Sequence, residues 1–246
     1  MTMFRSGNPA LREDTFRSVA RAVGEERMTL QGTVNRTGIS LLILLAAAAL
    51  VWNQDGATAG VFILLGLIGG LVTALVTTFK NTWAPFSTPV YAAFEGLLLG
   101  GISAMYEARF PGLVINAVAL TFGTLAALLV AYRSGLVRAT ENFKLGVFAA
   151  TGGIAIVYLV SMVLGLFGRS IPYIHESGLV GIGFSLFVVA IAALNLVLDF
   201  DFIERGAARG APKYMEWVGA FGLLVTLVWL YLEILRLLAK MQDRRR

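Results

Sequence analysis

Long stretches without a charged side chain alternate with short polar segments along the chain. The hydrocarbon core of a bilayer is about 30 Å thick, and a helix crosses it with about 20 residues. We expect helices because backbone groups in lipid must be satisfied within their own segment. Five uncharged stretches are long enough, at residues 37–54, 56–79, 110–132, 145–168 and 177–198.

Two further apolar stretches carry ionisable residues. Residues 89–106 contain Glu95, and residues 217–239 contain Glu233 and Arg236. With these two, the pattern predicts an all-α integral membrane protein with seven transmembrane helices. The expected organisation is an N-terminal arm (1–36), a seven-helix membrane domain (37–241) and a basic tail (242–246).

The composition supports this picture and excludes several kinds of protein. Mean hydropathy is +0.77, and 57% of residues are hydrophobic while 14% are charged, which is too little polarity for a water-soluble surface. The absence of cysteine excludes disulfides and iron–sulfur clusters, and a single histidine, His175, disfavours a transition-metal site. A hard cation such as Ca²⁺ needs only oxygen ligands, so the composition does not exclude a site for it. We expect no bound cofactor.

Enzymatic readings find little support. An intramembrane serine protease needs a base, yet no predicted span contains a histidine. A retinal protein needs a lysine within its last helix, and Lys240 stands at the end of that segment. A twin-carboxylate protease would require Asp199 and Glu233 to approach each other. We therefore expect the protein not to be an enzyme.

The basic residues divide by side of the membrane. The N-terminal segment and alternate connections hold thirteen Lys and Arg, and the other connections hold only Arg109 and Arg169. The positive-inside rule then places the N-terminus in the cytoplasm. Because the basic residues flank apolar segments, we read the net charge of +5 as a topology signal and not as a nucleic-acid surface. The thirteen are Arg5, Arg12, Arg17, Arg21, Arg27, Arg36, Lys80, Arg133, Arg138, Lys144, Arg205, Arg209 and Lys213.

The two ends of the chain leave alternatives open. Seven crossings would put the basic tail outside, against the positive-inside rule, whereas a re-entrant last segment would return it to the cytoplasm. We favour seven crossings, because the loop charges accumulated over six helices outweigh those of a short tail. In the arm, Phe16, Val19, Ala20 and Val23 fall at helical spacing beside arginines. This spacing fits an interfacial helix, and equally a solvated arm.

Glycines recur inside the predicted spans. Gly96 and Gly100 form a small-xxx-small pattern, and Gly152 and Gly153 are adjacent. Small residues let membrane helices approach closely where no hydrophobic effect drives association. We read these glycines as packing positions.

Carboxylates inside a span invite a functional explanation, because an ionisable group at the bilayer centre costs about 2.5–3.5 kcal/mol on insertion scales. Asp199 and Asp201 are two residues apart, about 200° around a helix, and cannot share a face. Asp201 has Arg205 four residues later and is expected at the interface. Asp199 has Asn195 four residues earlier and is expected inside.

Glu95 and Glu233 complete the set of candidate acids. Glu95 lies about 10 Å deep from the cytoplasmic end of its span, and Asp199 should lie at a similar depth. Close carboxylates disfavour each other's charge, which would create a proton-sensitive switch or an oxygen-rich cation site. Glu233 could alternatively be neutralised by Arg236, three residues later.

Several segments together resemble the transmembrane Bax-inhibitor-motif family, most strongly a bacterial branch. They are Tyr91-Ala-Ala-Phe-Glu-Gly96 with Gly101-Ile-Ser103, Asp199-Phe-Asp-Phe-Ile203, Gly210-Ala-Pro-Lys-Tyr-Met-Glu-Trp217 and Leu230-Tyr-Leu-Glu-Ile-Leu-Arg-Leu-Leu238. The resemblance covers residues 37–240. It implies six helices around a central seventh, and a pH-sensitive calcium leak controlled by an acid on each of the last two helices, here Asp199 and Glu233.

Whether these two acids meet depends on the loop between their helices. With a loop at 204–216, Asp199 lies about 7 Å deep and Glu233 about 25 Å deep, and direct contact fails. If the last helix enters the membrane near Gly222, Glu233 rises to about 17 Å and a water-bridged or Arg236-mediated pair becomes plausible.

Two functions follow as hypotheses. The first is a pH-sensitive leak channel or exchanger for a cation, expected to be Ca²⁺, with Asp199, Glu233, Glu95 and Arg236 along the ion pathway and Ca²⁺ at Asp199 and Glu233. The second is a non-conducting regulator in the bilayer that binds other membrane proteins, such as a quality-control protease. Either protein is expected in a bacterial inner membrane.

Overall fold

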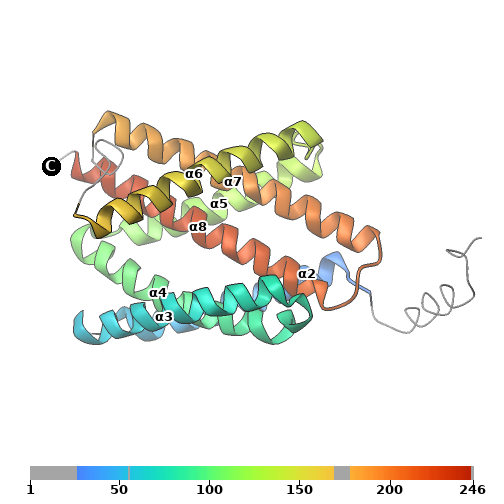
Figure 1. Cartoon of the computed structure of the whole chain (residues 1–246), viewed down its shortest axis with the longest axis horizontal. Helices are drawn as coiled ribbons and strands as arrows, with labels where there is room; N and C mark the ends of the chain where they lie inside the picture. The colour runs from blue at the N-terminus through green and yellow to red at the C-terminus, as the bar shows by residue number, and fades with distance from the viewer. Residues whose placement is uncertain (1–26, 55, 169–177, 245–246) are drawn as a thin grey trace, which may run out of the picture.

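Seven long helices make up the part of the chain that the computed structural model describes, residues 27–54, 56–168 and 178–244 (Figure 1). A short 3-10 turn, Asn81–Trp83, separates the second helix from the third. The predicted all-helical fold is thereby confirmed. The helices are α2 (Leu30–Trp52), α3 (Gly56–Phe79), α4 (Ala84–Arg109), α5 (Leu113–Arg133), α6 (Glu141–Leu166), α7 (Leu179–Ala208) and α8 (Met215–Asp243).

Six of these helices are long and apolar enough to cross a membrane. The exception is α4, which is as long as the others but less apolar. It contains Glu95, and Pro89 lies within it. The chain is therefore a multi-pass membrane protein whose least apolar helix carries one of the candidate acids.

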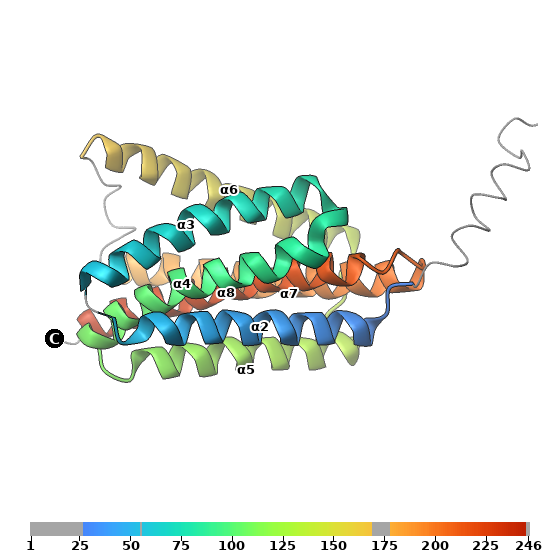
Figure 2. The ribbon, with the colours of Figure 1, turned by 90° about the horizontal axis from the view of Figure 1, so that it is seen from below.

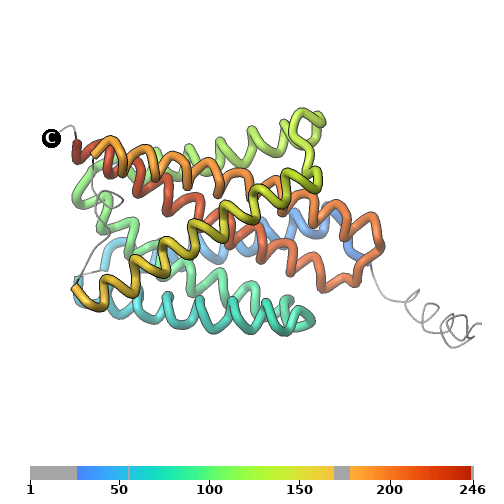
Figure 3. Tube along the Cα trace, turned by 45° about the horizontal axis from the view of Figure 1, so that its top comes forward, coloured from blue at the N-terminus to red at the C-terminus, as the bar shows by residue number. Residues whose placement is uncertain are grey.

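Helix α8 is the most buried of the six apolar helices. Its most apolar window is 67% buried, against 11–33% for the windows of the other five. It packs against α2, α4, α5 and α7, passing obliquely between the α2–α4 pair and the α5–α7 pair (Figure 3). Helix α3 packs mainly on α4, and α6 mainly on α7. A complete ring of six helices around α8 stays a prediction.

Local capping explains where α2 begins. The Thr29 hydroxyl accepts a hydrogen bond from the Gly32 N–H at 2.9 Å, so the helix starts at Leu30, before the uncharged stretch does. The first part of the predicted arm is not covered, because residues 1–26 lie outside the described part of the chain. The proposed interfacial helix at Phe16 to Val23 and the loop residue His175 lie outside it as well.

The glycines of α4 are a packing surface, as the small-xxx-small pattern predicts. A Cβ added at Gly96 would lie 2.3 Å from the Leu44 carbonyl oxygen, and one at Gly100 would lie 2.5 Å from the Ala48 carbonyl oxygen. The α2 and α4 backbones are therefore almost in contact. Gly152 and Gly153 differ, because an added Cβ there meets nothing within 4 Å.

The first and last turns of helix α8 lie at the two ends of the helix bundle. Glu216, in its first turn, meets Thr29 before α2, and Asp243, in its last turn, pairs with Arg109 at the end of α4 at 3.2 Å. Because α8 is one continuous helix, its C-terminal end lies opposite the start of α2 (Figures 1 and 2). A continuous helix that runs from one end of the bundle to the other favours the predicted full crossing over a re-entrant last segment.

Candidate functional site

A groove of about 510 Å³ runs among α3, α4, α7 and α8 and brings two of the candidate acids together. Glu95 enters it from α4 and Asp199 from α7. Its walls are otherwise mostly apolar, and the remaining polar side chains are Thr78, Tyr91 and Thr226. The groove thus concentrates two carboxylates in surroundings that offer them few polar partners.

Glu95 occupies room that a glycine provides. Gly70 of α3 faces it so closely that an added Cβ would lie 3.1 Å from the Glu95 Oε1 atom. The other carboxylate oxygen, Oε2, is buried and has no hydrogen-bond partner. Tyr91, one turn earlier on α4, lines the same groove. An acid with a buried oxygen left unpaired is costly to keep charged unless a cation or water reaches it.

Asp199 faces α8 at one of its glycines. Its Oδ1 atom lies 3.7 Å from the position of a Cβ on Gly222, and Thr226, one turn further along α8, acts on the carboxylate as a hydrogen-bonding neighbour. Its Oδ2 atom is buried without a hydrogen-bond partner. The same unpaired state is found for Glu95, so the groove contains two carboxylates with spare acceptor capacity.

Asp199 also borders a second hollow of about 320 Å³. This hollow reaches Asn81 in the turn between α3 and α4, and it shares Thr78 and Gly222 with the groove. The two hollows therefore adjoin at Asp199. Together they trace a route from the end of the bundle that holds the α3–α4 turn, past Asp199, to Glu95.

Asp201 points to the other side of α7, as its two-residue separation from Asp199 predicts. It forms ion pairs with Arg205 on its own helix and with Lys144 of α6, the latter at 3.3 Å. Asn195 donates to the Thr151 hydroxyl of α6 at 2.8 Å and to the Ile191 carbonyl oxygen. Both residues thus tie α7 to α6 or to itself, outside the groove.

Glu233 is held in a separate network. Its side chain is 2% exposed, and its carboxylate accepts hydrogen bonds from the Tyr158 hydroxyl of α6 at 2.8 Å and from Arg236 at 2.9 and 3.0 Å. Arg236 also donates to the Tyr158 oxygen at 2.9 Å. The alternative that Arg236 neutralises Glu233 is the arrangement found, and Tyr158 is a partner that sequence reasoning missed.

The structure does not bring Asp199 and Glu233 into contact. Asp199 faces α8 at Gly222 and Thr226, and Glu233 lies two turns further along that helix, about 10 Å at 1.5 Å per residue. The reason is the antiparallel pairing of α7 and α8, which sets Asp199 opposite the first half of α8. The acid that shares a groove with Asp199 is therefore Glu95 of α4, and not Glu233.

A shared Ca²⁺ site at Asp199 and Glu233 therefore lacks support from the geometry. Within residues 27–54, 56–168 and 178–244, no group of three or more acidic or histidine side chains has an arrangement that could hold a metal ion. Any cation that visits the groove would meet two carboxylates and neutral oxygens. Such a site suits a passing ion better than a tightly held one.

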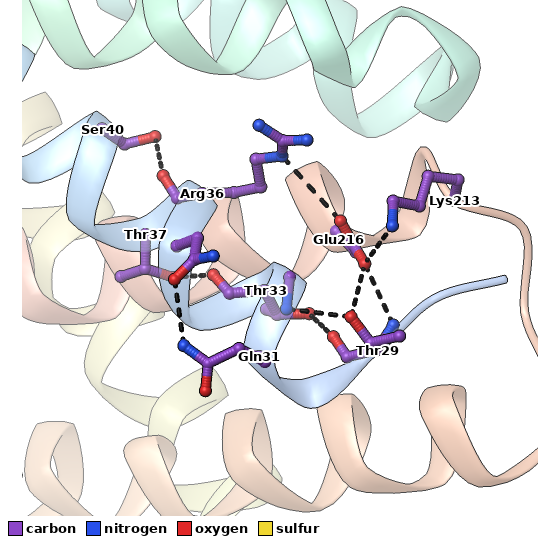
Figure 4. A network of polar contacts seen from close by, with 10 residues as sticks. Thr29, Gln31, Thr33, Arg36, Thr37, Ser40, Lys213 and Glu216 are labelled. Atoms are coloured by element: carbon purple, nitrogen blue, oxygen red, sulfur yellow. Dashed lines mark hydrogen bonds and ion pairs between the residues drawn. The ribbon is translucent and has the colours of Figure 1, made fainter. Parts of the chain in front are cut away.

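A fully buried carboxylate that sequence reasoning missed lies at the start of α8. Glu216 is 0% exposed and accepts hydrogen bonds from the Thr29 N–H at 3.0 Å and the Thr29 hydroxyl at 2.9 Å (Figure 4). Lys213 lies 3.3 Å and Arg36 3.8 Å from its oxygens. A carboxylate in the first turn of a helix is stabilised by the positive end of the helix dipole. The position of Glu216 at the start of the last helix was therefore the signal in the sequence that could have identified it.

This Glu216 network fastens the N-terminal side of α2 to the turn before α8. A Cβ on Gly32 would lie 1.9 Å from the Glu216 carboxylate, so only glycine leaves room for it. Beside it, the Met28 N–H donates to the Ala211 carbonyl oxygen at 2.8 Å. The arm therefore leaves the membrane domain at a fixed point next to the α7–α8 turn.

Comparison with known proteins yields one family. The model of the family described as Bax inhibitor 1 like matches residues 8–243, nearly the whole chain. No curated protein matches the chain. The match extends through the groove acids, the Glu233 network and the Glu216 network, so all three belong to the part of the chain that the family model describes.

Proposed function

Because the chain belongs to the Bax inhibitor 1 like family, we propose that it is a pH-sensitive cation leak channel or exchanger of the bacterial inner membrane, with Ca²⁺ as the transported ion. The observation that carries this proposal is the groove in which Glu95 and Asp199 each keep a buried oxygen without a hydrogen-bond partner. Intramembrane acids that structural partners do not neutralise are typical of ion and proton pathways.

The chemistry of the groove favours a cation in transit. Ionised carboxylates attract a hard divalent cation and can replace part of its water shell, and the hydroxyls of Thr78 and Thr226 add neutral oxygens. Protonation of either acid would remove its charge and with it the attraction. Flux and proton concentration would thereby be linked through Glu95 and Asp199.

Glu233 takes a different part in this proposal. Its charge is matched by Arg236 and its carboxylate is held by Tyr158, so it fixes α8 against α6 and does not face the route. Movement of α8 relative to α6 would have to break this network. In this proposal Glu95 and Asp199 line the route, and Glu233 and Arg236 affect it indirectly by holding α8 in position.

The orientation follows from the distribution of basic residues. Arg36, Lys144 and Arg205 lie toward the end of the bundle that holds the Glu216 network, and the positive-inside rule assigns that end to the cytoplasm. In this orientation the hollow at Asn81 opens on the cytoplasmic side.

Calcium flux in liposomes that enclose a calcium-sensitive dye tests the proposal. We expect Asp199→Asn and Glu95→Gln each to reduce the flux or flatten its pH dependence, and the double variant to abolish the pH dependence. Asp201→Asn is the matched control, because it removes a carboxylate two residues from Asp199 but outside the groove. Unchanged flux and pH dependence in the folded double variant would refute the mechanism.

A further inference from the structure

A long crevice between α2 and α5 is not used by the proposed route. It consists of two successive hollows, of about 750 Å³ beside the start of α2 and about 420 Å³ beside its end. Leu41 borders both hollows, and Leu223 and Leu224 of α8 form adjoining parts of their floor. The two hollows are therefore parts of one crevice that follows α2 and α5.

The crevice has the length and the lining of a site for acyl chains. Helices α2 and α5 run antiparallel, as Figure 2 shows, and they are not packed directly against each other. The shorter of them has 21 residues, about 31 Å at 1.5 Å per residue, which equals the hydrocarbon thickness of a bilayer. Leucine, valine and alanine side chains, including Leu44, Leu99 and Val118, line most of the hollow beside the end of α2.

The wide end of the crevice carries two arginines. Arg133, from the last turn of α5, and Arg138, from the connection that follows, both line its mouth. Arg138 donates a hydrogen bond to the Gly135 carbonyl oxygen at 3.3 Å. In the described part of the chain, neither guanidinium forms an ion pair with a carboxylate.

The acids at the same mouth already have partners. Asp201 is paired with Arg205 and Lys144, and Glu204 accepts a short hydrogen bond from the Tyr132 hydroxyl. Asp201 is thus neutralised by its own ion pairs, and the Glu204 carboxylate is held by Tyr132. The positive charge of Arg133 and Arg138 remains available to an anion.

The connection between these arginines has the character of a membrane interface. Leu136, which lies between them in the sequence, is 83% exposed. An exposed leucine flanked by arginines fits a segment whose apolar side chain enters the lipid while the guanidinium groups stay at the level of the phosphates. The mouth of the crevice would therefore lie at headgroup depth.

We infer that the α2–α5 crevice binds an anionic phospholipid, whose phosphate meets Arg133 and Arg138 and whose acyl chain lies along α2 toward Leu41. A guanidinium offers a planar pair of donors that matches phosphate oxygens, and these contacts are charge-assisted. The apolar walls exclude a soluble anion as the preferred occupant, because such a ligand would leave the crevice empty. The occupant is therefore a lipid and not a free phosphate.

The headgroup contact is tested by native mass spectrometry of the purified full chain in micelles containing phosphatidylglycerol and phosphatidylcholine. We expect retained phosphatidylglycerol, and Arg133→Gln/Arg138→Gln should lower its affinity by about ten-fold or more, because each basic residue near the membrane surface attracts an anionic headgroup. Lys80→Gln/Arg209→Gln is the control, since it removes two positive charges near the same end but outside the crevice. Equal losses in both double variants, or no loss in the first, would overturn the inference.

The acyl-chain contact is tested with a matched pair of glycines. Gly38 lines the wide hollow and Gly152 lies on α6, and an added Cβ meets nothing within 4 Å at either position. Gly38→Leu should therefore fill the crevice and displace the lipid, while Gly152→Leu should retain it. If Gly38→Leu binds phosphatidylglycerol normally, or if soluble glycerol phosphate competes as well as the lipid, the site does not hold an acyl chain.

Discussion

At the scale of single residues, the acids of this protein differ in what surrounds them. Among the described residues, Glu95 and Asp199 each have a buried oxygen without a hydrogen-bond partner and form no ion pair, whereas Glu216 and Glu233 are almost fully buried and are ion-paired with basic side chains. Buried acids with several donors fix structure, because removing the acceptor leaves the donors unsatisfied. Burial alone therefore does not distinguish the acids of the proposed route; the lack of an ion pair does.

Replacing Glu216 should destabilise the protein strongly. Glu216→Ala leaves both Thr29 donors and the charge of Lys213 without their acceptor, and we expect a loss of about 2–4 kcal/mol, from hydrogen bonds to a charged group worth about 1.5–3 kcal/mol each. Thermal unfolding in detergent measures the change. Glu141→Ala, which removes an exposed acid from the first turn of α6, should leave the unfolding temperature nearly unchanged. Similar stability of the two variants would contradict the structural role of Glu216.

At the scale of helices, some glycines allow two helices to approach closely, and others face no neighbouring helix. Gly96 and Gly100 of α4 face the backbone of α2, while Gly152 and Gly153 of α6 face open space. The sequence alone shows glycines inside spans in both helices. Only the position of a neighbouring helix separates those that a side chain would disrupt from those that would tolerate one.

Alanine substitutions should divide accordingly. Gly96→Ala and Gly100→Ala put a methyl group within 2.3 and 2.5 Å of rigid carbonyl oxygens, so α2 and α4 must separate and the unfolding temperature should fall. Gly152→Ala and Gly153→Ala should be neutral or stabilising, because alanine is favoured over glycine in a helix by about 1 kcal/mol. Equal effects in α4 and α6 would show that the α2–α4 contact is looser than described.

At the scale of the whole molecule, the continuous α8 helix determines which chain segments share an end. Its first turn meets Thr29, and its last turn meets Arg109. The C-terminal end of α8 therefore lies opposite the end that holds most of the basic residues in the described part of the chain. By the positive-inside rule we expect the basic residues of the earlier loops, and not those of the tail, to set the orientation.

Cysteine labelling in a bacterial host tests this orientation, since the chain has no cysteine of its own. Ser134→Cys lies in the α5–α6 connection and Gln54→Cys in the α2–α3 connection, at opposite ends of α2 and α5. With the N-terminus inside, an impermeant maleimide added to intact spheroplasts should label Gln54→Cys and spare Ser134→Cys. Permeabilised cells should label both, and the reverse pattern in intact ones would invert the topology.

The sequence was enough to predict what depends on chain-local patterns. The apolar stretches predicted the helices, the two-residue spacing placed Asp199 and Asp201 on different faces, and the family was identified from short segments of α4, α7 and α8. These results follow because helix periodicity and the cost of charge in lipid act on each segment separately.

The tertiary structure decided which residues meet. It brought Asp199 and Glu95 into one groove, added Tyr158 of α6 to the Glu233–Arg236 pair, and buried Glu216 against Gly32. Contacts of this kind depend on the register and crossing of helices distant in the sequence, which no single segment encodes. For this reason the sequence alone placed acids in the membrane, whereas only the packing of α3, α4, α7 and α8 showed which two of them share a groove.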